Sequence, residues 1–567
     1  MATFDFDTLQ QQLVPTAGSA VLSHGILVFQ LSPTELVPTV QRLRCEFNFD
    51  IFLDVTAVDW PGHALRFEVV YHFYSTVHRV RVRVKTRVAE TDPCVDTLVP
   101  YYGSAAFMER ECHDMYGIVF CGNADLRPIL LYEGFVGHPL RKDYPKQQEQ
   151  PIVPYRHRHK TDVVAIISNP VRSILEGGLR DDSVIVNIGP SHPATHGTVQ
   201  IIAELDGERV LRTDIHCGYL HRGFEKECED HTWHNLIPYV DRLNYVSALI
   251  NDFVYCDGVE QLMGVQITPR CRYLRTLLSE YSRLVDHLTC LAAGLMELGA
   301  MTAFLYLVMV RDFMYEHLAA LTGARVTYTY GRIGGLAHDL PVGWLARLEE
   351  ILVQYEEFIG RVHGLVDRNR IFIDRMRDVG VINTADALSY GYTGPLLRST
   401  GVPRDLRKDM PYLAYAELDF EVPVGIKGDN YDRYYIRMRE MDESVHMMRQ
   451  LMEMLPEGPI NVTDRRCSFP DKSLVYSEIE SLINHFKLTI DGPAVPVGEV
   501  YSAHEAPNGE LGFYMVSTGS GIPHKVHVRS PSFVHMGGVH LMINGDQLAD
   551  IVPTFGSVNM IGGECDR

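Results

Sequence analysis

The sequence lacks the closely spaced cysteine pairs that usually hold iron-sulfur clusters or zinc. Its eleven cysteines are spread along 567 residues, and none forms a CxxC pair. Because such sites usually draw on neighbouring thiolates, we expect the chain to bind no metal and no cluster of its own. We expect most of these cysteines to be buried thiols in a reducing compartment.

Two further patterns are missing, and these absences and the net charge each argue against a class of protein. No GxGxxG motif follows a strand-like run, so we expect no dinucleotide-binding fold. The amino terminus shows no basic stretch followed by an apolar one, so we expect no export signal and a cytoplasmic protein. The net charge of -20 argues against general nucleic-acid binding.

Long apolar runs are also scarce. The longest nearly apolar segment, Leu288 to Val310, is interrupted by Glu297 and flanked by charged residues. A membrane-spanning helix needs roughly 20 apolar residues, so the segment predicts a buried core helix, and any membrane association would come through partners. Glu297 must either lie at a helix edge or orient a partner such as a histidine.

Length and composition predict a globular protein of at least two domains. Hydrophobic residues make up 46 % of the chain and charged residues 22 %. Strand-like and helical patterns are mixed, so the predicted fold class is α+β. We expect a small α+β domain at 1–145, a linker at 146–182, and a larger domain at 183–567 in which small β-sheets flank a helical bundle.

Two hairpins are predicted, one in each domain. Valines alternate with basic residues from Arg79 to Val88, which predicts a half-buried strand that forms a hairpin with 65–74. We expect its basic face to meet solvent or another subunit in preference to nucleic acid. In the larger domain, Asp206-Gly207 is typical of a hairpin turn.

A helix is predicted in AFMERECHDMYG, ending at Gly117. Its acidic residues are either an acid/base cluster or a polar face that forms ion pairs with Arg110 and its neighbours, and we favour the second interpretation. These acids are Glu109, Glu111 and Asp114.

The most informative motif is GPSHPATHG, at Gly189 to Gly197, which places two histidines in a turn after an apolar run. Pro193 restricts its own φ and pushes the preceding residue toward an extended conformation. His192 and His196 are therefore candidates to exchange protons near neutral pH, although paired histidines in a turn are also typical of an ordinary loop.

A group of histidines and cysteines follows this motif, but the spacing of these residues is not that of a metal site. Its members are His216, Cys217, His221, Cys228, His231 and His234. Only His231 with His234 approaches the spacing of two ligands on one helical face, so we expect no metal here. Arg242 and Tyr245 come next, in YVDRLNYVSALIND beside an apolar run.

Taken together, these motifs resemble those of the fused C and D subunits of bacterial respiratory complex I, the proton-translocating NADH:quinone oxidoreductase. ERECHDMYGIVF and DLRPILLYEGFVGHPLRKDYP are similar to the C-subunit signature, and GPSHPATHG, GYLHRGFEK, GRIGGLAHDLP and ECDR to the D-subunit signature. The resemblance implies a peripheral-arm subunit on the cytoplasmic face of the inner membrane, active only within the complex.

The D subunit is similar in fold to the large subunit of nickel-iron hydrogenases, which are therefore the main rival. Hydrogenases hold their metals through two CxxC motifs. The matching positions in this chain are Asn244, Ser247, Ile561 and Glu564. None is a thiolate ligand, and Cys565 lies one position off and alone, so the resemblance implies no nickel-iron centre.

The resemblance instead implies a quinone site shared with a B-like subunit, which carries the terminal 4Fe-4S cluster. His196 and Tyr245 match residues that hydrogen-bond the quinone headgroup, where donors must face carbonyl oxygens that gain negative charge. His192, His221 and Arg222 would line the pocket.

Supporting residues are implied in the same way. Glu297 stands where the family usually has an aspartate, which orients the histidine matching His196. Arg242 matches an arginine beside the terminal cluster. Thr327 stands where many members place a histidine. The segment from Leu396 to Arg404 would help to shape the cavity and its contacts with partners.

The implied partners also include an I-like ferredoxin subunit, a G-like subunit and a membrane-arm H-like subunit. Quinone is the substrate, either ubiquinone or menaquinone, and NADH binds to another subunit. Two alternatives stay open: an assembly scaffold without chemistry, and an electron-transferring relative fed by ferredoxin or another donor.

Overall fold

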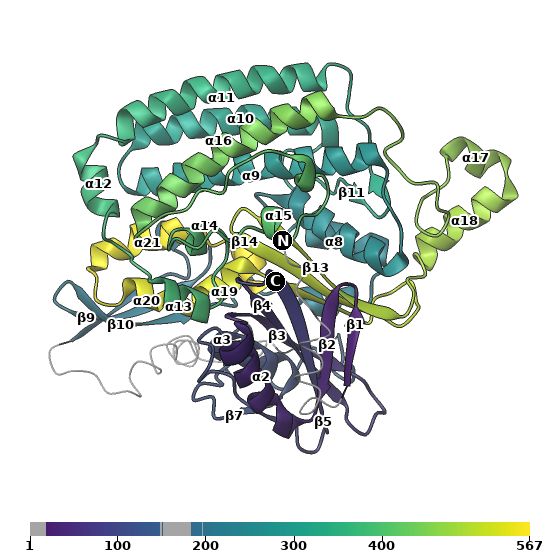
Figure 1. Ribbon diagram of the computed structural model, residues 1–567, viewed down its shortest axis with the longest axis horizontal. Coiled ribbons are helices and arrows are strands. Elements are labelled where there is room, and N and C mark those ends of the chain that lie inside the picture. The colour runs from purple at the N-terminus through teal and green to yellow at the C-terminus, as the bar shows by residue number, and fades with distance from the viewer. Residues whose placement is uncertain (1–18, 148–149, 151–182, 196) are drawn as a thin grey trace, which may run out of the picture.

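The computed structural model describes residues 19–147, 150, 183–195 and 197–567. Most of the predicted linker therefore lies outside the described residues, and so does His196. The described chain is α+β, as predicted. A β-sheet with helices forms the amino-terminal part, and a layer of long helices with small sheets forms the rest (Figure 1).

The amino-terminal part is built on a five-stranded sheet in the order β1-β2-β5-β4-β3. Its elements are β1 (Ser19–Ser23), β2 (Ile26–Leu31), α2 (Pro33–Phe47), β3 (Ile51–Asp59), β4 (Phe67–Ser75), β5 (Val80–Val88), β6 (Cys94–Asp96), α3 (Ala105–Tyr116) and β7 (Val119–Cys121). β4 and β5 pair antiparallel, which confirms the predicted hairpin. A disulfide between Cys94 and Cys121 joins β6 to β7.

The rest of the chain contains two three-stranded antiparallel sheets around the helices. The strands are β8 (Val184–Ile188), β9 (Gln200–Asp206), β10 (Arg209–His216), β13 (Gly498–Ala506), β14 (Gly509–Ser517) and β15 (Lys525–Arg529). The long helices are α8 (Ala248–Met263), α9 (Pro269–Glu297), α10 (Met301–Thr322), α11 (Trp344–Val366) and α16 (Asn430–Met454).

Shorter helices connect these elements. Those that matter below are α6 (Phe224–Cys228), α7 (Ile237–Val240), α12 (Arg370–Met376), α14 (Gly394–Arg398), α15 (Leu406–Asp409), α17 (Lys472–Ser477), α18 (Ile479–Ile490), α19 (Pro531–Gly538), α21 (Ile551–Val558) and α22 (Gly562–Asp566). α17 and α18 project from the body of the molecule (Figure 1).

The apolar segment 288–310 forms the junction of two helices, so its prediction as one core helix is wrong. α9 ends at Glu297 and α10 begins at Met301, with Gly299 between them in the left-handed region at φ 83°. Apolarity alone does not distinguish one buried helix from two that pack on each other. Among the described helices, none is both long and apolar enough to cross a bilayer.

The basic face of β5 is buried, which corrects the prediction of a half-buried strand. Arg81 and Arg83 are 5 % and 1 % exposed. Arg81 pairs with Glu510 of β14, and Arg83 pairs with Glu499 of β13, each at 2.9 Å. The amino-terminal sheet thus packs against a second sheet more than 400 residues away in sequence, a partner that the alternation within β5 does not reveal.

The acidic helix α3 has a structural role, although not with the expected partners. Glu109 and Asp114 accept hydrogen bonds from backbone amides at 2.8 and 3.1 Å. Glu111 pairs with Arg567 at 2.8 Å, while Arg110 pairs with an aspartate outside the helix. The favoured interpretation of a polar face paired with Arg110 is therefore wrong in its details, because Glu111 is buried against the carboxyl-terminal end of the chain and the other two acids against loops of the amino-terminal part.

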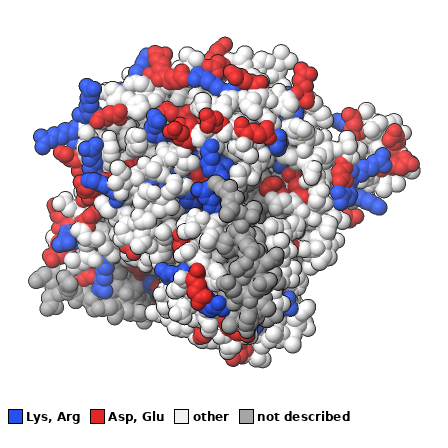
Figure 2. Space-filling view, viewed as in Figure 1, with Lys and Arg blue, Asp and Glu red and all other residues white. Residues whose placement is uncertain are grey.

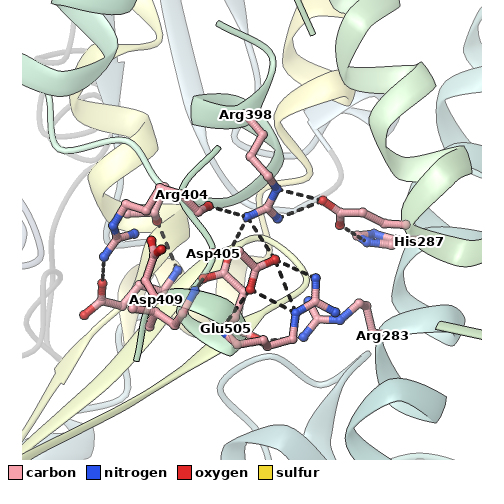
Figure 3. A network of polar contacts seen from close by, with 12 residues as sticks. Arg283, His287, Arg398, Arg404, Asp405, Asp409 and Glu505 are labelled. Carbon is pink, nitrogen blue, oxygen red and sulfur yellow. Dashed lines mark hydrogen bonds and ion pairs between the residues drawn. The ribbon is translucent and has the colours of Figure 1, made fainter. Parts of the chain in front are cut away.

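A buried network of charges ties α9, α14 and α16 to β13 (Figure 3). Arg398 pairs with Glu440 and Glu505 at 2.8 Å each, and His287 lies 2.8 Å from Glu440. Arg398 and Arg404 are 0 % and 2 % exposed. Two residues of the stretch from Leu396 to Arg404, which was expected to shape the cavity and its contacts with partners, therefore lie in buried ion pairs.

Charges on the surface are mixed in sign. In the face shown in Figure 2, basic side chains lie among acidic ones over the helical layer and over the projecting α17 and α18. No continuous basic surface is visible in this view among the residues that are drawn in colour.

A second ionic cluster lies where the amino-terminal sheet meets the rest of the chain. His527 of β15 lies 2.8 Å from a carboxylate oxygen of Asp54 on β3 and 2.6 Å from one of Glu225 on α6. Burial alone would lower the pKa of His527, but the two carboxylates raise it to about 9. The imidazolium therefore helps to join the two parts.

We predict that this pairing makes the free energy of unfolding fall at alkaline pH. A raised histidine pKa stabilises the fold fully below about pH 6.5, and the contribution, roughly 3 kcal/mol, is lost as the pH rises through about 9. Chemical unfolding of the full chain from about pH 6 to about pH 10 should show this loss in the wild type and not in His527→Gln. The exposed His446→Gln is the control, and parallel pH curves for wild type and His527→Gln would contradict the prediction.

Candidate functional site

The GPSHPATHG turn begins directly after β8. Gly189 has a φ of 91°, and a Cβ there would lie 2.2 Å from the carbonyl oxygen of Val199, so the turn requires glycine. A short 3-10 helix covers Pro193–Thr195. His192 is exposed on this turn, and His196, the other candidate, lies outside the described residues.

Tyr245 lies on the loop between α7 and α8. The side-chain oxygen of Asn244 accepts hydrogen bonds from the two backbone amides that follow Tyr245, at 3.2 and 3.3 Å, and so fixes the loop. Tyr245 is half-buried beside the bundle core. Burial raises the pKa of its phenol, and the negative charges of Asp286 and Glu564 raise it further.

Helix α22 brings the loop and the turn together. A Cβ at Gly563 would lie 2.6 Å from the carbonyl oxygen of Leu243 and 3.3 Å from Cδ1 of Tyr245. A Cβ at Gly197 would lie 3.6 Å from the backbone nitrogen of Gly562. The first residues of α22 thus contact the Tyr245 loop and also the end of the histidine turn.

A buried polar cluster lies beside this phenol, and no motif in the sequence predicts it. Asp286 on α9 accepts hydrogen bonds from Asn244 at 3.1 Å and from Asn559 at 2.8 Å. Glu564 on α22 accepts a hydrogen bond from the hydroxyl of Ser532. The two acids are 1 % and 0 % exposed, and burial raises the pKa of Glu564 to about 7.

The positions that match hydrogenase ligands lie in and around this cluster. Asn244 and Glu564 belong to it, the backbone amide of Ser247 donates to Asn244, and the amide of Ile561 donates to Ser532 at 3.2 Å. Their amide, carboxylate, hydroxyl and aliphatic side chains are not the soft donors that a nickel-iron centre needs.

Cys565 is not alone, which corrects the expectation from sequence. Its sulfur, that of Cys217 and a carboxylate oxygen of Asp566 lie within 4.8 Å of one another, and all three residues are buried. The sequence did not reveal this group because Cys217, just after β10, and the carboxyl-terminal helix meet only in the folded chain.

His221 and Arg222 lie near the carboxyl-terminal end of α22. His221 Nδ1 is 2.7 Å from the carbonyl oxygen of Asp566, and Arg222 donates to the carbonyl of Tyr239 at 2.7 Å. Arg222 and Arg242 are both exposed. These two residues of GYLHRGFEK therefore contact α22 and α7, the helix that precedes the Tyr245 loop.

Glu297 is half-buried at the carboxyl end of α9, a position compatible with both of its predicted roles. α21 packs against both α9 and the 3-10 helix of the histidine turn, so α9 and the turn share a neighbour. Thr327 follows α10 with a φ of 57°, in the left-handed region that β-branched residues rarely adopt.

The remaining histidines do not converge on one point. His231 Nε2 lies 3.1 Å from the hydroxyl of Tyr239, and His216 lies 3.2 Å from a carboxylate oxygen of Asp214. Burial lowers the pKa of His234 to about 4. The described histidines of this segment thus contact separate partners.

Two protein families match separate parts of the chain. Residues 29–150 match the family described as "Respiratory-chain NADH dehydrogenase, 30 Kd subunit". Residues 297–567 match "Respiratory-chain NADH dehydrogenase, 49 Kd subunit". The first range falls on the amino-terminal sheet, and the second includes α22 and Glu297.

Known relatives cover one or both parts. The D subunit of NADH-quinone oxidoreductase from Pelobacter propionicus is 67 % identical over 399 residues, which are 70 % of this chain and 99 % of that protein. The C/D subunit from Bdellovibrio bacteriovorus is 43 % identical and covers 93 % of this chain and 92 % of its own. A C/D subunit from Aquifex aeolicus is 37 % identical, with 95 % of each chain covered. The chain therefore belongs to the family of fused C/D subunits of NADH-quinone oxidoreductase, respiratory complex I.

Proposed function

We propose that this complex I subunit forms the quinone headgroup site together with a B-like subunit that carries the terminal 4Fe-4S cluster. The observation that carries the proposal is the position of Tyr245, half-buried on a fixed loop against α22 and near two buried carboxylates. The end of the nearby GPSHPATHG turn, at Gly197, lies against the same helix.

Reduction of a quinone takes two electrons and two protons, and the protons must arrive as charge develops on the carbonyl oxygens. Tyr245 keeps its proton at neutral pH because burial and the neighbouring acids raise its pKa. A positioned phenol then donates to an oxygen that becomes basic as it receives electrons. His196 is the second proposed donor, on the resemblance of its motif.

The supporting residues act on this pair. Glu297, half-buried at the end of α9, is proposed to orient His196. Arg242 is exposed, and its charge would favour the reduced state of the partner's cluster. His192, His221 and Arg222 are proposed to line the pocket near α22.

The other proposed partners are the I-like, G-like and membrane-arm H-like subunits, and the proposed location is the cytoplasmic face of the inner membrane. Quinone is the substrate in this proposal, and this chain supplies proton donors and a binding surface. The metal centre that delivers the electrons belongs to the B-like subunit.

The first test is Tyr245→Phe, which removes the phenolic proton and keeps the ring. We predict that NADH:quinone activity in membranes falls at least about tenfold, as for the loss of a positioned proton donor. NADH oxidation by an artificial acceptor that takes electrons upstream should be unchanged. Tyr435→Phe, at an exposed tyrosine of α16, is the control, and full quinone activity in Tyr245→Phe would exclude the proposed role.

The second test changes the electrostatics beside the phenol. At alkaline pH the charged Glu564 raises the pKa of Tyr245, so Glu564→Gln should lower that pKa and move the alkaline limb of the NADH:quinone pH profile to lower pH. Exposed Glu421→Gln is the control. A limb that stays in place, or moves to higher pH, would refute this coupling.

A further inference from the structure

Arg437 on α16 is a buried cation without an ion-pair partner among the described residues. The residue is 1 % exposed, and its Nε and Nη2 atoms have no hydrogen-bond partner among the described residues. No carboxylate in the described part of the chain forms an ion pair with it. Burial of an unpaired charge is costly, and the proposed quinone chemistry makes no use of this residue.

Other buried arginines nearby do have partners. Arg398 pairs with two glutamates. Arg433, one helical turn before Arg437, donates to the side-chain oxygen of Asn430 at 2.7 Å and to the carbonyl of Gly380 at 2.6 Å. These acceptors are neutral, so Arg433 forms no direct ion pair within the described chain, although the charges of Asp429 and Asp432 act on it.

Arg437 lines a cavity between α9, α12, α16 and α21. The cavity has a volume of about 30 Å³, which is enough for roughly two water molecules. Its wall is mainly apolar, with Leu291, Leu295, Leu298, Phe372, Met376 and Pro553. The hydroxyls of Tyr434 and Ser557, which also line it, already donate to other groups.

The buried neighbours respond to the charge of Arg437. Burial lowers the pKa of His287, and Arg437 lowers it further, while the hydrogen bond and the charge of Glu440 act in the opposite direction. Burial raises the pKa of the Cys290 thiol to about 11, while Arg437 acts in the opposite direction. Both neighbours are therefore neutral near pH 7 and do not compensate the guanidinium.

We propose that this cavity is a binding site for a small monovalent anion of halide size. A halide is only slightly larger than water, and it can accept from more than one N–H group while it offsets the charge. A larger oxyanion would need more room and more polar partners than the apolar wall provides. Water alone would satisfy hydrogen bonds and leave the charge uncompensated.

The test is the melting midpoint of the full chain in sodium bromide against sodium gluconate at equal ionic strength. An anion that binds only the folded chain should raise the midpoint of the wild type by about 2 °C or more, with saturation. Arg437→Met should melt at the same temperature in both salts. Arg439→Met, at a half-exposed arginine of the same helix, should respond like the wild type.

A second variant guards against misfolding of Arg437→Met. Gly294 lies on the cavity wall, and a Cβ there would meet no atom within 4 Å. Gly294→Val should fill the space and abolish the bromide response while Arg437 is retained. Anomalous diffraction from bromide-soaked crystals of the full chain should place a peak beside the guanidinium.

Two results would overturn the proposal. The first is a wild-type melting midpoint that does not respond to bromide. The second is an equal response in wild type and in both cavity variants, which would assign the effect to the surface and leave the cavity to water.

Discussion

The close approach of α22 to the Tyr245 loop is the contact that holds the proposed site together. A side chain at Gly563 would collide with the carbonyl of Leu243, so glycine is required where helix and loop meet. The same helix carries Glu564 beside the phenol and places the Asp566 carbonyl against His221. One five-residue helix therefore contacts the Tyr245 loop, carries an acid that acts on the phenol of this proposed proton donor, and holds the GYLHRGFEK loop.

Buried ion pairs extend this arrangement across the whole molecule. Arg567, the residue after α22, pairs with Glu111 of the amino-terminal part, and the pairs of β5 with β13 and β14 join the two sheets. Leaving one member of a buried ion pair without its partner is costly. The two parts of the chain that match the two families therefore share one interior. The amino-terminal part has no proposed chemistry, and we propose that it braces the carboxyl-terminal site.

The sequence was sufficient where local pattern decides the structure. The β4–β5 hairpin and the turn at Asp206 follow from alternation and turn residues, and both were predicted. Prediction from the sequence failed where contacts between distant segments decide the structure. The basic face of β5 is buried by a second sheet, and an apolar run forms a helix junction at Glu297. The polar cluster joins Asp286 to Asn559 across 273 residues, so no spacing reveals it. The resemblance to the family identified Tyr245 as a candidate, but it did not identify the acids that raise the pKa of its phenol.

A structure of the assembled complex with a short-chain quinone bound would decide whether Tyr245 contacts the substrate. The distance to measure joins the phenolic oxygen of Tyr245 to the nearer quinone carbonyl oxygen. We predict a hydrogen bond of about 2.6–3.0 Å, with the headgroup beside α22 and the histidine turn. A headgroup bound elsewhere, with neither carbonyl within reach of the phenol, would contradict the proposed site.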